Sequence, residues 1–293
     1  MILAGIYQLW SSAWPAGLTL LGLGGGFAVV LLIASIKLKV VIDPKIEQIH
    51  KALPNVDCGA CGFAGCGQYA KAVSGNPELL GKCAPGGPET AAKIAQILNL
   101  QISDSGPAER PIVHCRAHTV DKTLYGKYKG IASCTAANSL ANVQACKFGC
   151  LGFGDCTMVC QFDALAMVDG LAMVDYEKCT GCGACSRACP RNLIEMAPFA
   201  QDNMMTVACS SKEKGKSTRG MCKVGCIGCG VCAKKSEQFV VEDNLARLSY
   251  KKYEPGEETE AAFNKCPTGV IIYVGKSAPP PRQPAKKTAA AKT

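Results

Sequence analysis

The chain has 293 residues, enough for two or three modules; 20 of them are Cys and only 6% are aromatic, which leaves little for large apolar cores. The cysteines recur in tight C-x2-C runs, which is typical of metal or iron–sulfur ligands and excludes a small secreted disulfide scaffold. The formal net charge of +9 counts every thiol as neutral, but a [4Fe–4S] cluster on four thiolates carries roughly two negative charges, so nucleic acid is not an expected partner.

Residues 15–36 carry no charge and are long enough to cross a bilayer as one helix. A secretory signal is the competing interpretation, but no Lys or Arg precedes Lys37, whereas Lys39 and Lys45 follow it. By the positive-inside tendency, the remainder of the chain is expected on the cytoplasmic side. The glycines of this segment lack the other residues of a phosphate loop and favour packing against a second membrane helix. Residues 1–42 are therefore predicted to be a membrane anchor.

Residues 43–103 form the first predicted cysteine module, built on the motif LPNVDCGACGFAGCG and a later CAPGG. Its four thiols are Cys58, Cys61, Cys66 and Cys83. Interspersed glycines let peptide N–H groups approach cluster sulfurs, which favours a [4Fe–4S] site over zinc, although zinc stays the alternative. Short helices are expected at residues 68–73 and 90–100.

Residues 104–205 contain two related halves, CKFGCLGFGDCTMVCQFDALAM and CTGCGACSRACPRNLIEM. The second is a full C-x2-C-x2-C-x3-C-P run; the first is stretched, and Gln161 replaces the usual Pro. In two-cluster bacterial ferredoxins the first three cysteines of each run bind one cluster and the fourth binds the other. Carried over to this chain, the pattern assigns one cluster to Cys146, Cys150, Cys156 and Cys189, and its neighbour to Cys160, Cys179, Cys182 and Cys185. Residues 165–168 and 171–175, hinged at Asp169-Gly170, are predicted to be a strand pair.

Residues 206–275 are predicted to be a one-cluster ferredoxin-like module, because Ser236 stands where a two-cluster module has its fourth cysteine. The closing ligand comes later, in the sequence CPTGVI. The assigned ligands are Cys226, Cys229, Cys232 and Cys266. Residues 239–242 and 246–249 are the expected strand pair, and residues 276–293, rich in Pro, Ala and Lys, are expected to be a disordered tail.

Four cysteines are left over: Cys115, Cys134, Cys209 and Cys222. They supply enough thiols for a fifth cluster, but their spacing matches no compact motif, and buried inert thiols are the alternative. A zinc site pairing His118 with Cys115 is a further alternative. His50 and His114 are most simply interpreted as solvated.

The apolar helix, the motif from residue 53 to 87 and the tandem ferredoxin motifs together resemble the RnfB family of the Rnf complex over nearly the whole chain. Some longer members of that family carry cysteines for a second cluster in the last module, which this chain lacks. The resemblance implies an α+β fold in the bacterial cytoplasmic membrane, with soluble ferredoxin as electron donor and other membrane and peripheral subunits as partners. It implies a complex that couples ferredoxin and NAD oxidoreduction to Na+ or H+ transport.

The residues themselves show no nucleophile–base pair, flavin site or nicotinamide fingerprint, so the chain is expected to transfer electrons without a complete catalytic site of its own. An electron-transfer subunit of another membrane oxidoreductase and a zinc-stabilised membrane scaffold are the alternatives. A basic stretch is a candidate surface for an acidic carrier, with a solvated loop as the plainer interpretation. It comprises Lys212, Lys214, Lys216 and Arg219.

Overall fold

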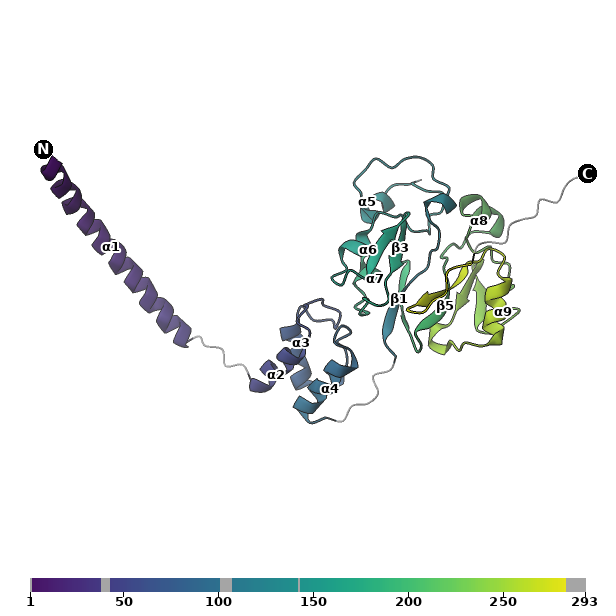
Figure 1. The fold of residues 1–293 in the computed structure, drawn as a ribbon, viewed down its shortest axis with the longest axis horizontal. Coiled ribbons are helices and arrows are strands. Elements are labelled where there is room, and N and C mark those ends of the chain that lie inside the picture. Colours follow the sequence, from purple (N-terminus) through teal and green to yellow (C-terminus); the bar gives the residue numbers. More distant parts are fainter. Residues whose placement is uncertain (1, 38–42, 101–106, 142, 283–293) are drawn as a thin grey trace, which may run out of the picture. The chain divides into compact units, whose positions relative to one another are not determined.

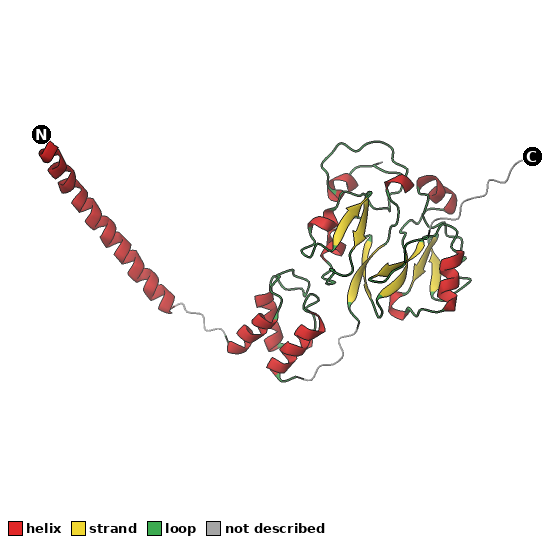
Figure 2. Ribbon diagram, viewed as in Figure 1, coloured by secondary structure: helices red, strands yellow, loops and turns green. Residues whose placement is uncertain are grey.

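The structure is a computed structural model that describes residues 2–37, 43–100, 107–141 and 143–282. It is a mixed α+β chain, as predicted, and divides into two compact units between Glu47 and Gln48 (Figures 1 and 2).

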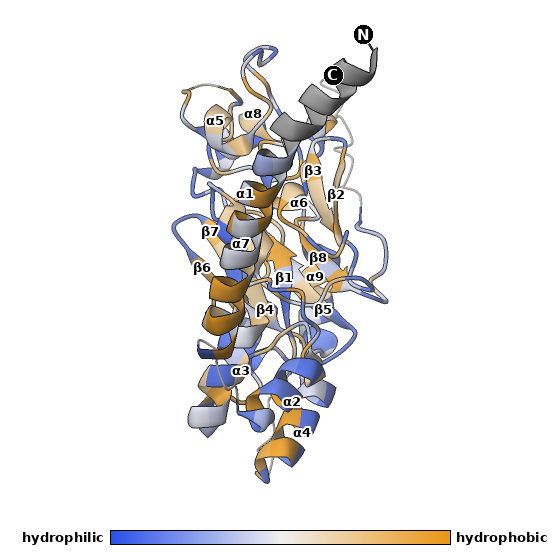
Figure 3. Ribbon diagram, turned by 90° about the vertical axis from the view of Figure 1, so that its left-hand side faces the viewer, coloured by the Kyte–Doolittle hydropathy of each residue, from blue (hydrophilic) through white to orange (hydrophobic). Residues whose placement is uncertain are grey.

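The first unit is dominated by a single long helix, α1 (Ile2–Lys37), which contains Pro15. Its stretch Gly17–Lys37 has a mean hydropathy of 2.2 and is long and apolar enough to cross a membrane. Much of this stretch is orange, and so hydrophobic, in Figure 3, and its large apolar side chains, for example Leu20 and Leu31, are exposed. A helix that is apolar all round without burying a face needs an apolar surrounding, which a bilayer supplies.

The first cysteine module is helical. It contains α2 (Pro44–Ala52), α3 (Cys66–Gly75), the 3-10 helix η1 (Pro77–Leu79) and α4 (Gly87–Leu98). The two predicted helices are confirmed as α3 and α4. Tyr69 and Ile94 are fully buried at the centre of this module, and the Tyr69 hydroxyl donates to the carbonyl of Leu79 at 2.9 Å.

Next comes a module of two small antiparallel sheets. Its elements are β1 (Glu109–Val113), η2 (Thr119–Asp121), α5 (Cys134–Asn138), α6 (Asp155–Met158), β2 (Leu165–Val168), β3 (Leu171–Val174), α7 (Ala184–Ala188) and β4 (Ile194–Pro198). The β2–β3 pair is the predicted hairpin, with Asp169 and Gly170 at positive φ as a two-residue turn requires. The other pair, β1 with β4, joins the first and the last strand of the module.

The last module repeats this arrangement. It contains β5 (Asn203–Val207), α8 (Gly215–Met221), β6 (Phe239–Glu242), β7 (Leu245–Leu248), η3 (Tyr250–Lys252), α9 (Glu257–Lys265) and β8 (Ile271–Gly275). The predicted strand pair is confirmed as β6–β7, whose second strand begins one residue early. Because β5 pairs with β8 from Asn203 onward, the last module starts a few residues before the predicted boundary at 206.

A small apolar core joins these two modules. Ile112 of β1, Ala197 of β4 and Met204 of β5 are buried together, and Tyr250 packs against them. The Tyr250 hydroxyl lies 2.8 Å from that of Thr206. The two modules therefore form one body, with β1 and β5 at their junction (Figure 1).

The predicted tail is partly packed. The Arg282 guanidinium donates to the carbonyls of Phe263 at 2.5 Å and Cys266 at 3.1 Å. Residues 276–282 thus belong to the last module, and residues 283–293 lie outside the described residues.

Candidate metal centres

The four thiols of the first module share one neighbourhood. Burial raises the pKa of Cys83, and the charges of Cys66, Cys58 and Cys61 raise it further, so the four thiols interact electrostatically. Cys58 comes from the loop before α3 and Cys66 is the first residue of that helix, where the Asp57 carboxylate accepts the Cys66 N–H at 2.6 Å. The fold thus brings the four thiols of this sequence motif together.

The structure places Cys146 elsewhere than the spacing assigned it. Cys150 and Cys156 line a cavity with Cys189, but the fourth thiol there is Cys134. Burial and then the neighbouring thiols, Cys134 among them, raise the pKa of Cys156 to about 12. This cavity thus groups Cys134, and not Cys146, with Cys150, Cys156 and Cys189.

Asp155 holds Cys134 beside this cavity through hydrogen bonds to the backbone. Its carboxylate accepts the backbone N–H of Cys134 at 2.6 Å and that of Thr135 at 2.9 Å. Burial raises the pKa of Asp155, but hydrogen bonds from Thr135, Cys134 and Ser133 outweigh it and the pKa is lowered. Since Asp155 directly precedes Cys156, it ties the start of α5 to the cavity.

The third and fourth groups contain the cysteines that the spacing assigned to them. Burial and then the charges of Cys179, Cys182 and Cys160 raise the pKa of Cys185 to about 12. In the last module, one cavity is lined by Cys226, Cys229, Cys232 and Cys266. Cys229 is exposed while Cys226 and Cys232 are buried, so this group lies near the surface.

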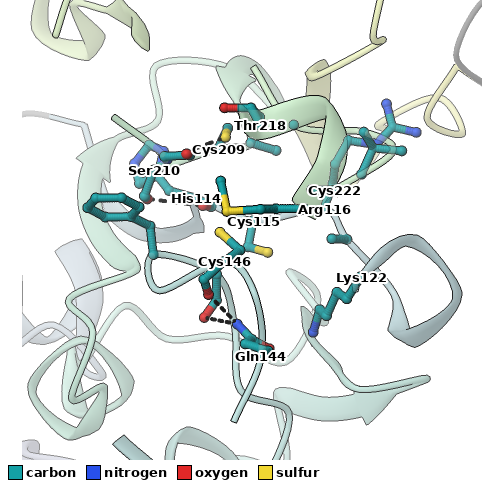
Figure 4. A pocket seen from close by; sticks show the side chains of 18 residues that line it. His114, Cys115, Arg116, Lys122, Gln144, Cys146, Cys209, Ser210, Thr218 and Cys222 are labelled. Atoms are coloured by element: carbon teal, nitrogen blue, oxygen red, sulfur yellow. Dashed lines mark hydrogen bonds between the residues drawn. The ribbon is translucent and has the colours of Figure 1, made fainter. Parts of the chain in front are cut away.

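Cys146 lies in a separate cavity between the two ferredoxin-like modules (Figure 4). The other thiols on its walls are Cys115, Cys209 and Cys222. Burial raises the pKa of Cys209 to about 12 and that of Cys222 to about 11.

The two histidines beside Cys115 have other partners. His114 is not solvated: Nδ1 lies 3.0 Å from the Val207 carbonyl and Nε2 lies 3.0 Å from the Glu195 carboxylate. His118 Nδ1 lies 3.2 Å from the carbonyl of Val168. His118 is not on the wall of the cavity that Cys115 lines, so the structure does not bring together the two residues of the zinc alternative.

Glycines with positive φ shape the cysteine loops. Gly152, Gly181 and Gly228 occupy the same place in their runs, two residues after a cysteine, and all three have φ between 63° and 85°. Each donates its peptide N–H to the thiol of that cysteine. Peptide N–H groups aimed at sulfur are what an iron–sulfur cluster requires of its surroundings.

The cavities fit clusters better than single ions. Among the described residues, no three Cys, His, Asp or Glu side chains converge closely enough to ligate one ion. Zinc would need four ligand atoms about 2.0–2.3 Å from a single point. Thiols that ring a cavity instead leave room for the irons and sulfides of a cubane, and all 20 cysteines are free of disulfides.

Comparison with known proteins supports the same chemistry. Residues 53–85 match a family described as a putative Fe-S cluster, and residues 172–195 match one described as a 4Fe-4S binding domain. The chain is 35% identical over 260 residues to the B subunit of the Na(+)-translocating ferredoxin:NAD(+) oxidoreductase complex of Acetobacterium woodii, covering 86% of this chain and 76% of that relative. The chain belongs to the RnfB family of ion-translocating oxidoreductase complexes.

Other members of the RnfB family match over similar lengths. The B subunit of the ion-translocating oxidoreductase complex of Methanosarcina acetivorans is 38% identical over 80% of this chain and 89% of its own length. That of the proton-translocating ferredoxin:NAD(+) oxidoreductase complex of Clostridium ljungdahlii is 37% identical over 84% and 87%. The resemblance to RnfB is confirmed, and the relatives' names include both Na+ and proton translocation.

Proposed function

We propose that the chain is the membrane-anchored iron–sulfur subunit of an Rnf-type complex and relays electrons from reduced ferredoxin into it. The complex would couple ferredoxin and NAD oxidoreduction to Na+ or H+ translocation. The observation that carries this proposal is the gathering of cysteines from distant parts of the sequence into separate groups of four. Family membership adds the circuit, because relatives that match most of this chain are named for ferredoxin, NAD and ion translocation.

Four groups are proposed as [4Fe–4S] ligands. They are Cys58, Cys61, Cys66 and Cys83; Cys134, Cys150, Cys156 and Cys189; Cys160, Cys179, Cys182 and Cys185; and Cys226, Cys229, Cys232 and Cys266. A bound [4Fe–4S] cluster supplies reversible one-electron transfer. Four thiolates per group leave no open iron position for a substrate, which favours electron transfer over catalysis.

The protein's own residues provide charge balance and shape. Lys122 Nζ donates to the carbonyls of Cys150 and Gly170, each at 2.7 Å. Arg110 donates to the carbonyl of Cys179. These cations stand beside the ligand loops, where they offset the negative charge of thiolate-bound clusters and fix the loops against the neighbouring strands.

The anchor helix supports a membrane location. The apolar part of α1 ends at Lys37, and Lys45 follows in α2. Basic residues on one side of the span favour the bacterial cytoplasmic membrane with the cysteine modules on the cytoplasmic side.

Anaerobic purification from membranes tests the proposal. We expect brown protein that contains iron and sulfide but no zinc, low-temperature EPR signals after reduction, and co-purification with membrane subunits. Reduced ferredoxin should bleach its visible absorption. Colourless, zinc-loaded protein would contradict the electron-transfer role, and iron-loaded protein that ferredoxin leaves oxidised would place it in a different oxidoreductase.

A further inference from the structure

The two ferredoxin-like modules share a five-residue repeat that their cluster runs do not explain. It reads CKFGC at residues 146–150 and CKVGC at residues 222–226. In each copy the last cysteine, Cys150 or Cys226, lines its own module's cavity. The first cysteine, Cys146 or Cys222, instead lines the cavity between the modules.

A second pair of cysteines occupies equivalent strand positions. Cys115 follows the end of β1 at Val113 by two residues, and Cys209 follows the end of β5 at Val207 by two residues. Both strands pair with the last strand of their module. Each module therefore contributes two thiols, from equivalent places, to one cavity.

Hydrogen bonds repeat with the same symmetry. The Cys150 N–H donates to Cys115 Sγ at 3.5 Å, and the Cys226 N–H donates to Cys209 Sγ at 3.3 Å. The inter-module thiols thus touch the ligand loop of the cluster group on either side. Each side of the cavity therefore offers two thiols with a peptide N–H group beside one of them, and such N–H groups stabilise thiolates that bind a cluster.

We propose that Cys115, Cys146, Cys209 and Cys222 hold a further [4Fe–4S] cluster between the two ferredoxin-like modules. This inference rests on the proposed function, because it treats grouped thiols as cluster ligands. The spacing of the sequence left Cys134 together with Cys115, Cys209 and Cys222. In the cavity between the modules, Cys146 takes the place of Cys134.

The loop that carries Cys146 is held in this orientation. Gln144, which is buried, donates to the carbonyls of Cys146 at 2.8 Å and Gly149 at 3.1 Å (Figure 4). The Arg191 guanidinium donates to the same two carbonyls at 3.1 and 2.7 Å. These four bonds fix the turn from which the Cys146 thiol enters the cavity.

The glycine before the second cysteine of each repeat is closely packed. A Cβ at Gly149 would lie 3.2 Å from Gln144 Nε2 and 3.4 Å from Cys146 Sγ, and one at Gly225 would lie 2.7 Å from Thr218 Cγ2.

Arg116 and Lys122 are the cations on the cavity wall. They supply positive charge where a cluster would bring negative charge.

Paired substitutions in the full-length, anaerobically purified chain test the ligand set. Cys115→Ala/Cys146→Ala removes two thiols from one proposed site, whereas Cys115→Ala/Cys134→Ala removes one thiol from each of two sites. We expect wild-type protein to hold about 20 iron atoms, the first variant about 16 and the second about 12, with about four iron atoms per site. A site that has lost a ligand can keep a three-iron cluster. EPR of the oxidised protein detects such a cluster, and the site is then counted as altered.

Two single variants complete the test, the first as a control for folding and the second as a test of one ligand. Ser210→Ala changes another residue on the same cavity wall and should keep the full iron content. Cys222→Ala alone should remove one reduced-cluster EPR signal and leave the others unchanged.

The outcomes separate the inference from the proposed function. Wild-type protein with about 16 iron atoms, meaning four occupied sites, would overturn the further cluster and leave the electron-transfer role intact. Loss of two clusters from Cys115→Ala/Cys146→Ala, or of only one from Cys115→Ala/Cys134→Ala, would overturn the exchange. Wild-type protein without iron would contradict the proposed function itself.

Discussion

Single glycines decide whether the cysteine loops can close. Gly228 has φ +63°, and a Cβ there would lie 2.6 Å from the carbonyl oxygen of Asn244, in the β6–β7 turn. Gly230, two residues further on, has φ +70° but no atom within 4 Å of its Cβ position. Substitutions at Gly228 and Gly230 therefore share the backbone strain but differ in steric contact, so that comparing them distinguishes the two effects.

We predict that Gly228→Ala speeds iron release from the last module, while Gly230→Ala changes it little. Both variants carry the left-handed strain of about 1–2 kcal/mol, but only Gly228→Ala must also displace the β6–β7 turn. The loss of visible absorption with time in urea measures the difference. Equal rates for the two variants would contradict the steric explanation.

Asp155 acts on its cluster site through the backbone of α5. We predict that Asp155→Ala lowers stability by about 1–2 kcal/mol, the usual effect of losing a helix-capping side chain, and reduces iron at the group containing Cys134. Asp155→Asn keeps an acceptor oxygen and is the matched control. Iron analysis and urea denaturation report on the two effects separately, and full iron content in Asp155→Ala would show that Cys134 reaches the cavity without the cap.

At the scale of elements, the outer strand pairs organise the body more than the hairpins do. The β2–β3 and β6–β7 pairs are local and follow from short alternating segments with turn residues between them. The β1–β4 and β5–β8 pairs join the two ends of each module. They place Cys115 and Cys209 at the junction and form the core between modules.

We predict that Ile112→Ala in β1 lowers the free energy of unfolding by about 2–5 kcal/mol, because it empties a fully buried position. Val240→Ala in β6 is the control, since the side chain is exposed and its loss should change stability by no more than about 0.5 kcal/mol. Ile112 and Val240 are 0% and 51% exposed. Denaturation midpoints followed by circular dichroism compare them, and similar midpoints would contradict an inter-module core at Ile112.

For the whole molecule, cysteines are part of the apolar cores. Cys226 and Cys232 pack with Phe239 and Ile271 in the last module, and Cys150 and Cys156 pack with Leu171 in the module before it. Metal and fold are therefore coupled, as in other small metal-binding domains.

We predict that chelating the iron unfolds the ferredoxin-like body. Far-UV circular dichroism should lose its β signal, and proteases should cleave within residues 107–282. Anaerobic addition of iron and sulfide should restore the signal, whereas zinc should not. An iron-free chain with an unchanged spectrum would show that the apolar core suffices by itself.

The anchor belongs to a unit of its own. We predict that a chain lacking residues 1–42 is released from membranes and keeps its iron, because no cysteine lies in the removed segment. Cell fractionation with iron analysis measures both properties. Membrane retention of the shortened chain after salt washing would indicate a second attachment to the membrane or its complex.

The sequence by itself determined the elements whose signals are local. The apolar segment, the two hairpins, helices α3 and α4 and the complete C-x2-C-x2-C runs all rest on residues close together in the chain. The membership of Cys189 and Cys266 in distant groups was also predictable, because ferredoxin motifs encode that pairing.

Only the tertiary structure decided how the isolated cysteines group. By spacing, Cys146 is the expected partner of Cys150. The structure places Cys134 there instead, through contacts of Asp155, Gln144 and Arg191 that span up to 45 residues. The CKFGC and CKVGC repeat was visible in the sequence, but its meaning depended on strands β1 and β5 meeting at the junction. Long-range pairing brings thiols together by geometry, which residue spacing alone does not encode.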